Sequence, residues 1–333
     1  MQLSFVIPAY NASTTIVRCL NSIYSLPLNE CDFEIICIDD CSTDNTISVI
    51  KDYGQLHSNI KLLCQEVNQR QGAARNRGVS IAKGKYIMFV DSDDKIDKGV
   101  LDALQLAEDN NLDMVAMHYV NVDEKGNISE KEPVTIDGVF SGIDMQEKHP
   151  YWGSAPWPYL FKNSFLKNAE YPFAEGVLFE DSDFVAVHLY HAKRMMYSEI
   201  CSYRMHYNAY STTHTMSYKH VSDYFILGTR MLKFYESLPD ASSRFAKIIL
   251  EGGSYNIYKS CSRLFKLSSI QEVKNFYCRI DSYSSRTKIY EYKDILFYWN
   301  TWFYLCIKHK YVTIALTSLG IITSKLKKII AEL

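Results

Sequence analysis

Residues 84–97 read GKYIMFVDSDDKID, an apolar run that ends in a cluster of carboxylates. Residues 85–90 are typical of a strand that is buried on both faces, and Asp91, Asp93 and Asp94 follow it directly. Removing a carboxylate from water costs several kcal/mol unless it is paired or binds a cation. The cluster therefore has to lie at an edge of a sheet, where it faces either water or a metal ion.

The composition indicates a globular protein, because 333 residues with 47% hydrophobic content can bury a large core. The 36 Lys and Arg residues balance 38 Asp and Glu residues, so no overall basic field exists to hold a nucleic acid, and we expect no nucleic-acid partner. Nine cysteines without a CxxC pair predict buried thiols in a reducing compartment. Residues 1–11 lack the pattern of a signal peptide, so we expect a cytoplasmic protein.

Strand-like and helix-like patterns alternate through the first third of the chain. Residues 13–24 place apolar side chains on one helical face behind a capping Ser13, and another helix is expected from a capping Asp44 to Gly54. This alternation predicts an α/β fold with a mainly parallel sheet, right-handed crossovers and flanking helices. Strands are expected at residues 3–8, 33–39, 60–64, 85–90 and 113–120.

The pattern changes after residue 120. Turn signals are followed by an aromatic, proline-bearing stretch at residues 149–161, which we expect to form a lid or an acceptor-binding region. Residues beyond 216 are helical in pattern and rich in tyrosine. We therefore expect one α/β domain over residues 1–215, in halves 1–120 and 121–215, and a helical region over residues 216–333.

Polar residues follow the first, second and fourth expected strands, and ligands of open parallel sheets bind at this end of the strands. The stretches are PAYN at 8–11, DDCSTDNT at 39–46 and DSDD at 91–94. The spacing of Asp91 and Asp93 suits Mg²⁺ or Mn²⁺, which commonly also binds substrate phosphates. Helix capping is the alternative for both acidic stretches, but it leaves Asp39 and Asp40 unexplained.

A basic segment, NQRQGAARNRG at residues 68–78, precedes the acidic strand. It places Arg70, Arg75 and Arg77 near the start of a helix, where the helix dipole adds to their positive charge. These arginines face either a diphosphate or only water.

Four separated segments, in order, resemble the family 2 glycosyltransferases of the GT-A fold: FVIPAYNA, CIDDCSTDNT, QGAARNRGVSIAKGKYIMFVDSDD and FAEGVLFEDSDF. The resemblance covers about residues 1–215 and makes residues 1–120 the nucleotide-binding half and residues 121–215 the acceptor-binding half. It implies transfer of a hexose from a nucleotide-diphosphate donor, commonly a UDP-sugar, to an acceptor hydroxyl with inversion. The acceptor would be a glycan or a lipid-linked sugar, as in the synthesis of cell-surface polysaccharides.

The resemblance also implies catalytic roles. Asp181 would be the general base, Glu180 would position it, and Asp183 is a competing carboxylate. A departing nucleoside diphosphate gains negative charge, so a divalent cation, Mn²⁺ or Mg²⁺, is expected on Asp91 and Asp93.

Binding roles follow from the same resemblance. Arg204 and Ser211 would reach the diphosphate, and His206 or His214 would complete the metal shell. Trp157 would stack on an acceptor sugar, with packing in the core as the alternative. The residues expected to bind the nucleotide or its phosphates are Pro8, Ala9, Tyr10, Asp39, Asp40, Arg75, Asp91 and Arg204.

Residues 295–333 hold two apolar runs with aromatic residues and lysines between and after them. Neither run reaches the roughly 18 residues of a membrane span. The pattern favours helices that lie on anionic lipid at the inner face of the cell membrane. The alternative is that these helices close the core or form a dimer contact.

Two other functions are compatible with parts of the pattern. A non-catalytic nucleotide-sugar-binding module of the same fold would bind nucleotide and turn over no donor. A metal-dependent nucleotidyltransferase would carry a Gly-rich basic loop after the first strand, whereas PAYNASTT at residues 8–15 has no such loop.

Overall fold

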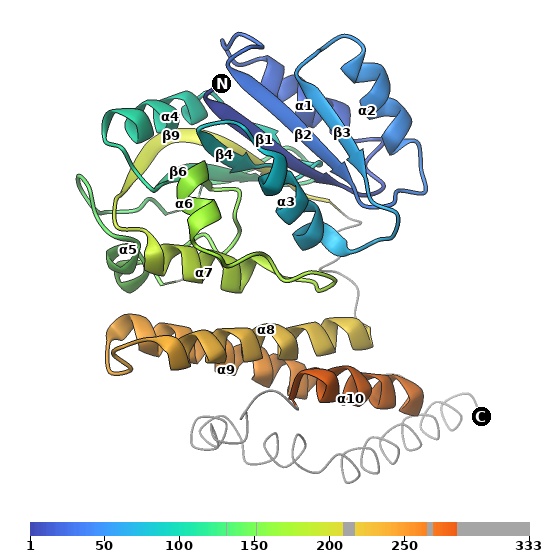
Figure 1. Ribbon diagram of the computed structural model, residues 1–333, viewed down its shortest axis with the longest axis vertical. Helices are drawn as coiled ribbons and strands as arrows, with labels where there is room; N and C mark the ends of the chain where they lie inside the picture. The colour runs from blue at the N-terminus through green and yellow to red at the C-terminus, as the bar shows by residue number, and fades with distance from the viewer. Residues whose placement is uncertain (131, 151, 209–216, 265–268, 285–333) are drawn as a thin grey trace. The chain divides into compact units, whose positions relative to one another are not determined.

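The structure is a computed structural model that describes residues 1–333 except 131, 151, 209–216, 265–268 and 285–333 (Figure 1). It divides into two compact units, Met1–Tyr210 and Ser211–Leu333.

The first unit contains four parallel strands in the order β3-β2-β1-β4. All residues of β1, β2 and β4 are buried, as expected for near-continuous apolar runs that are covered on both faces. The bounds confirm the predicted strands to within a residue: β1 Leu3–Ala9, β2 Phe33–Asp39, β3 Ile60–Cys64 and β4 Tyr86–Phe89.

The sheet continues beyond β4 with mixed directions. Strand β8 (Tyr159–Lys162) runs antiparallel between β4 and β6 (Met114–Val122), and β9 (Met195–His206) is parallel to β6. Two short strands, β5 (Lys95–Ile96) and β7 (Ile128–Glu130), pair antiparallel with β9 and β6. The expectation of a lid is therefore wrong at Tyr159–Lys162, because this segment pairs inside the sheet.

Helices connect the strands, as the alternation predicted. Helix α1 begins at Ile16 rather than at a cap on Ser13, whose N–H donates instead to Asp44 Oδ2 at 3.2 Å. Helix α2 begins at Thr46 with Asn45, rather than the predicted Asp44, at the N-cap position, although Asp44 Oδ1 accepts from the N–H of Thr46 at 2.9 Å. The helices of this unit are α1 Ile16–Tyr24, α2 Thr46–Gly54, α3 Arg70–Ile81, α4 Gly99–Asp109, α5 Gly142–Lys148, α6 Asn163–Asn168 and α7 Asp181–His191.

Helices α3 and α7 lie on the same side of the sheet (Figure 1). Helix α3 approaches β1 closely, because a Cβ on Gly78 would lie 2.3 Å from Val6 Cγ1. Phe184 of α7 stacks on Phe173 at 3.6 Å between ring centroids, and both rings meet Phe89 of β4 edge-on. This aromatic cluster fixes the end of α7 that carries the acidic residues over the end of β4.

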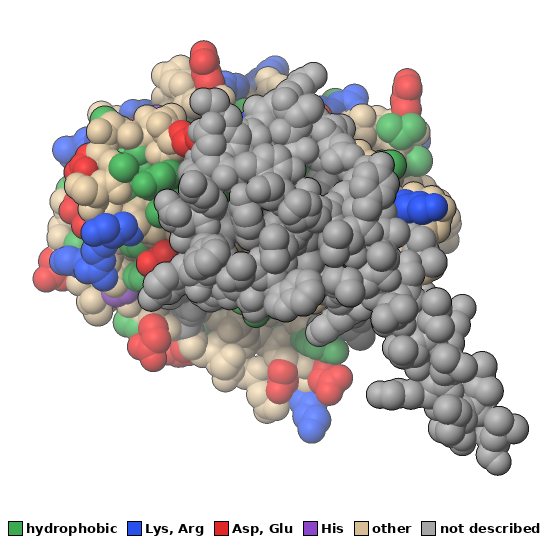
Figure 2. Space-filling model, turned by 90° about the horizontal axis from the view of Figure 1, so that it is seen from below, with side chains coloured by type: hydrophobic (Ala, Val, Ile, Leu, Met, Phe, Trp, Pro, Cys, Tyr) green, Lys and Arg blue, Asp and Glu red, His purple; other side chains and the backbone are tan. Residues whose placement is uncertain are grey.

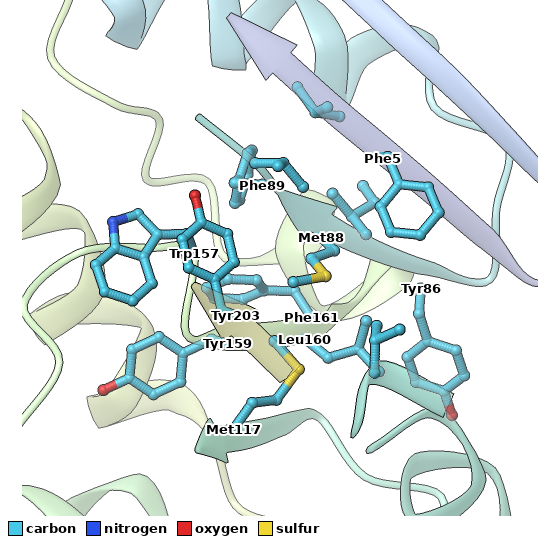
Figure 3. Close-up of a cluster of buried hydrophobic side chains, with 14 of the residues drawn as sticks. Phe5, Tyr86, Met88, Phe89, Met117, Trp157, Tyr159, Leu160, Phe161 and Tyr203 are labelled. Carbon is cyan, nitrogen blue, oxygen red and sulfur yellow. The ribbon is translucent and has the colours of Figure 1, made fainter. Parts of the chain in front are cut away.

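Side chains from the middle strands form a continuous core (Figure 3). Phe89 and Phe161 meet edge-on across the β4–β8 pair, at 5.6 Å between centroids. Trp157 stacks on Tyr203 of β9 with 4.5 Å between ring centroids. The core thus extends from the parallel strands to β9, beneath the acidic residues that follow β4.

The second unit contains α8 (Tyr218–Ser237), α9 (Arg244–Leu264) and α10 (Ile270–Ser284). Helices α8 and α9 cross closely, because a Cβ on Gly228 would lie 2.7 Å from the carbonyl oxygen of Gly253. Within the described ranges, no helix is both long and apolar enough to span a membrane. The membrane prediction for residues 295–333 lies outside the described residues.

The described part of the surface carries both positive and negative charge, and the described cysteines are not paired in disulfides. On the face shown in Figure 2, described side chains of both charge signs are interspersed. The cysteines that the structure describes are free thiols, of which Cys19 and Cys37 are buried. The expectation of burial is wrong for Cys31, Cys64 and Cys278, which are exposed.

Candidate active site

The register of the parallel strands brings the predicted polar stretches to one edge of the sheet. Ala9 at the end of β1 is paired with Asp39 at the end of β2, and Val6 is paired with Phe89 of β4. The N–H of Asp40 donates to the carbonyl of Ala9 at 2.8 Å. The residues that follow β1, β2 and β4 therefore meet, as their positions in the sequence predicted.

The loops after β1 and β2 are tied together by Asn11. Its Oδ1 accepts from the N–H of Thr43 at 2.8 Å, and its own N–H donates to Ser42 Oγ at 3.0 Å. Asn11 adopts a φ of 50°, which asparagine tolerates better than most residues. Beside it, Pro8 and Ala9 are buried, whereas the Tyr10 side chain is 48% exposed and is available to stack on a planar ligand.

Asp39 and Asp40 are both buried but differ in their partners. Asp40 Oδ1 accepts from Gln65 Nε2 at 2.6 Å and from the N–H of Gln69 at 2.7 Å. Burial raises the pKa of Asp40, although these hydrogen bonds lower it in part. Asp39 Oδ2 accepts from the N–H of Ser42 at 2.9 Å, while Oδ1 is buried and has no partner among the described residues. Of the two aspartates expected to bind the nucleotide, Asp39 therefore has the unused acceptor.

Residues 91–94, the acid loop, are held from β9 and the residues that follow it. The hydroxyl of Tyr203 accepts from the N–H of Asp91 at 3.0 Å and donates to Asp94 Oδ2 at 2.8 Å. Asp93 Oδ2 accepts from Asn208 Nδ2 at 2.7 Å. Burial and the charge of Asp91 raise the pKa of Asp93 and, more strongly, that of Asp94. Tyr203 and Asn208 lie beside Arg204 and His206, for which the resemblance implied roles, but their own contacts with the acid loop were not predicted.

Arg75 of α3 joins the acid loop to the start of α7. Its side chain is 2% exposed, Nη2 donates to Asp91 Oδ1 at 2.7 Å, and Nη1 donates to Glu180 Oε1 at 2.5 Å. Burial would lower the pKa of Arg75, but the charges of Asp91, Glu180 and Asp181 raise it above its usual value, so the guanidinium stays charged. The predicted contact of Arg75 with a nucleotide stays a prediction, since both of its terminal nitrogens bind carboxylates here.

The other arginines of this segment lie differently. Arg77 is exposed and its Nη1 donates to the carbonyl of Cys64 at 2.9 Å, which fits the alternative of a solvated basic side chain. Arg70 adopts a φ of 69° at the start of α3, directly after the Gln69 N–H that binds Asp40.

Helix α3 also positions the segment that leads into α7. Asn76 Nδ2 donates to the carbonyl of Phe173 at 3.0 Å, and its Oδ1 accepts from the N–H of Phe173 at 2.9 Å. A Cβ on Gly72 would lie 2.4 Å from the carbonyl oxygen of Ala174 and 2.9 Å from Glu180 Cγ, so only glycine permits this approach. The arginines of residues 68–78 stand out in the sequence by their charge, whereas Gly72 and Asn76 carry no comparable local signal.

Asp181 is the first residue of α7 and is half-buried. No other described residue donates a hydrogen bond to its carboxylate. Its pKa is raised to about 6, mainly by burial; the charge of Arg75 opposes this shift, and the charges of Asp91 and Asp183 contribute to it. Phe179, two residues earlier, has a φ of 64°, a strained conformation that costs on the order of 1–3 kcal/mol and is often found at functional sites.

Glu180 and Asp183 are buried on either side of Asp181. Burial raises the pKa of Glu180, and the charge of Arg75 opposes the shift. Asp183 Oδ2 accepts from the hydroxyl of Tyr171 at 2.9 Å. Asp181 is therefore the more accessible of the two aspartates that competed for the role of base.

Trp157 and Arg204 each contact other parts of this chain, so their predicted binding roles stay predictions. The Trp157 side chain is buried, stacked on Tyr203 and edge-on to Tyr119 at 4.6 Å, so the alternative of core packing accounts for it (Figure 3). Arg204 Nε donates to Asp97 Oδ2 at 2.8 Å, so this ion pair would have to open for a diphosphate contact. Ser211 and His214 lie outside the described residues.

A metal ion would have few protein ligands here. Within the described ranges, no group of three or more His, Cys, Asp or Glu side chains is arranged to hold an ion. The N–H of His206 donates to Asp94 Oδ1 at 2.7 Å, and its predicted role as a metal ligand stays a prediction. Asp91 and Asp93 fit a cation that takes its remaining ligands from substrate phosphates and water.

Comparisons with known proteins agree with this architecture. Residues 4–169 match the family model described as glycosyl transferase family 2. The chain is 43% identical over 97 residues to the poly(ribitol-phosphate) beta-glucosyltransferase of Bacillus spizizenii. This match covers 29% of this chain and 15% of the relative. It is 28% identical over 247 residues to the uncharacterized glycosyltransferase YibD of Escherichia coli, which is 70% of each chain.

A solved structure shows the same fold. The crystal structure of Staphylococcus aureus TarS 1–349 in complex with UDP-GlcNAc superposes with a TM-score of 0.65 at 20% identity. The match covers 84% of this chain and 81% of the TarS chain. The predicted GT-A fold is confirmed.

Proposed function

Because the chain belongs to glycosyl transferase family 2, we propose that it transfers a sugar from a nucleotide-diphosphate donor, a UDP-sugar, to an acceptor hydroxyl. The observation that carries this proposal is the double ion pair of Arg75. One buried guanidinium binds Asp91 of the acid loop and Glu180 next to Asp181. Arg75 thereby connects Asp91, which would serve the leaving diphosphate, to the segment that carries Asp181, which would deprotonate the attacking hydroxyl.

In the proposed reaction, Asp181 is the general base. Its carboxylate takes the proton of the acceptor hydroxyl while that oxygen forms a bond to the anomeric carbon. The bond from this carbon to the diphosphate oxygen breaks, and its electron pair leaves with the nucleoside diphosphate. Attack opposite the leaving group inverts the anomeric carbon, and a positioned base contributes about 10²–10⁴-fold to such a step.

The donor would bind across the ends of β1, β2 and β4. Tyr10 offers an exposed ring for the base, and Asp39 Oδ1 is a buried acceptor without a described partner, suited to an N–H of uracil. Asp40 is held by Gln65 and Gln69 and would orient this pocket. Pro8 and Ala9 would form its wall.

A divalent cation, Mn²⁺ or Mg²⁺, fits the acid loop. The mutual repulsion of these carboxylates, which contributes to the raised pKa of Asp93, is what a bound cation relieves. Asp91 and Asp93 would hold it. When bound, it would neutralise charge on the departing diphosphate.

The first test is a screen of nucleotide sugars that measures release of nucleoside diphosphate, with and without added Mn²⁺ or Mg²⁺. We expect hydrolysis or transfer with a UDP-sugar, and we expect Asp93→Ala to lose the dependence of the rate on metal concentration. Asp52→Ala, which removes an exposed carboxylate of α2, is the matched control. Binding of nucleotide without turnover of any donor would favour the non-catalytic module instead.

The pH dependence tests the identity of the base. A base acts when it is deprotonated, so kcat/KM should rise with pH and reach half its plateau near pH 6, the pKa of Asp181. An exposed carboxylate would place the midpoint near about pH 4. The residual rate of Asp181→Asn should lack this inflection; if it keeps the midpoint, another group is the base.

The acceptor and the location are part of the same proposal. The relative from Bacillus spizizenii is named for transfer to poly(ribitol-phosphate). We propose a glycan or lipid-linked acceptor of a cell-surface polymer, with the enzyme in the cytoplasm and residues 295–333 contacting the inner face of the membrane. A flotation assay in which a chain truncated before residue 295 binds vesicles as well as the full chain would contradict the membrane contact.

A further inference from the structure

A cavity of about 840 Å³ lies in the first unit beside the acid loop, and the catalytic proposal makes no use of it. Its walls come from α1, from β5, from the β6–β7 hairpin and from the end of β9. This volume lies within the range of about 300–1,000 Å³ that is typical of ligand pockets. The charged and titratable residues of its lining are Arg18, Lys95, Asp97, Arg204 and His206.

The lining has an excess of positive charge. Its carboxylate, Asp97, is paired with Arg204, which leaves Arg18 and Lys95 without a carboxylate partner among the described residues. Arg18 Nη2 donates to the backbone carbonyl of Asp93, but its Nε is buried and has no described partner. A buried donor that stays unsatisfied costs about 1–3 kcal/mol, so this nitrogen is suited to a ligand acceptor.

His206 adds a polar group to the lining. Its Nε2 is buried without a partner among the described residues. A neutral imidazole carries one ring N–H, which it can donate to an anion.

Apolar residues complete the lining. Val17, Ile96 and Val122 lie among the cations, and Ile128 on β7 is 55% exposed. Such a mixture suits a ligand with both an anionic group and carbon-rich surface, as in a phosphorylated polyol or sugar chain. Arginine and lysine are the side chains that most often bind phosphate.

We propose that this pocket binds a phosphodiester or phosphate group carried by the acceptor glycan. Arg18 and Lys95 would contact the anion, and the backbone contact of Arg18 to Asp93 places the pocket directly beside the acid loop. The assignment of the anion to the acceptor rests on the proposed function. The binding of a phosphate-bearing chain to this pocket does not depend on the proposed function, because it is measured without any donor.

The experiment uses the full chain and equilibrium titration with a soluble polyol-phosphate oligomer. The same polyol without phosphate, inorganic phosphate alone, and vesicles of phosphatidylglycerol and phosphatidylcholine are titrated in parallel. We expect Lys95→Glu to weaken binding of the oligomer at least about tenfold and Lys95→Gln to weaken it less. Lys98→Gln removes an exposed lysine outside the pocket and should leave the affinity unchanged.

The titrations either support or overturn the assignment of this pocket to a phosphate-bearing acceptor. Binding that falls with added salt and with Lys95→Glu, at an unchanged melting temperature, supports the pocket. Equal affinity for the phosphate-free polyol, or an unaltered Lys95→Glu variant, overturns it. If the protein binds vesicles through Lys95 but does not bind the oligomer, the proposal that the anion belongs to the acceptor is overturned. The anion would then be that of a lipid headgroup. These outcomes differ from failure of the proposed function, which would appear as absence of donor turnover.

Discussion

Asp181→Asn should lower kcat by at least about two orders of magnitude and leave nucleotide affinity nearly unchanged. The amide keeps the shape of the side chain but cannot accept the proton of the acceptor hydroxyl. The carboxylate is half-buried and receives no hydrogen bond from another described residue, so its loss should disturb little else. Turnover under saturating donor and acceptor, with nucleotide affinity measured by titration, checks both parts.

Asp183→Asn is the matched control, because it makes the same change two residues away. Asp183 is buried and accepts a hydrogen bond from Tyr171, so this variant should lose stability more than turnover. The assignment would be reversed if Asp183→Asn abolished turnover in a folded protein while Asp181→Asn retained it.

Arg75→Met should cause the largest loss of stability among single substitutions in the site. It leaves the buried Glu180 and the partly exposed Asp91 without their shared counter-ion, and breaking a buried pair such as Arg75–Glu180 costs about 3–5 kcal/mol. The acid loop and Glu180 would also move apart, and a displacement of roughly 1 Å at a catalytic site can cost about 100-fold in rate. Chemical denaturation and kcat measured below the melting temperature check the two effects.

Two further variants separate structure from catalysis. Arg77→Met removes an exposed arginine of the same helix and should change stability by no more than about 0.5 kcal/mol. Adding Glu180→Gln to Arg75→Met removes one unpaired charge, so stability should recover in part while kcat stays low. If the double variant regains wild-type turnover, Arg75 acts only on folding and does not position the base.

The sequence was sufficient to predict the parallel half of the sheet, because its strands are near-continuous apolar runs bounded by turn residues. It also located the acid loop, because several carboxylates directly after a buried strand have few structural explanations, whereas the acidic start of α7 was singled out only through the family resemblance. Both predictions depend on neighbours in the chain, where periodicity and spacing are informative.

Local sequence patterns did not predict the contacts between segments that are far apart in the chain. Arg75 and Glu180 are 105 residues apart, and no local pattern distinguishes a guanidinium in a buried ion pair from one that waits for a diphosphate. Strand β5 is two residues long and pairs with β9 more than 100 residues later, so it carries too little pattern to detect. Trp157 illustrates the same limit, because its exposure is set by Tyr119 and Tyr203.

The place of β8 in the sheet has a consequence for biosynthesis. Strand β4 ends at Phe89, but its antiparallel neighbour β8 begins only at Tyr159. At the roughly 5–20 residues per second of translation, one side of β4 stays unpaired for several seconds while the ribosome makes the segment between them. A nascent chain in this state presents an open apolar strand, so slow codons before residue 159 should promote aggregation and a chaperone that shields this edge should oppose it.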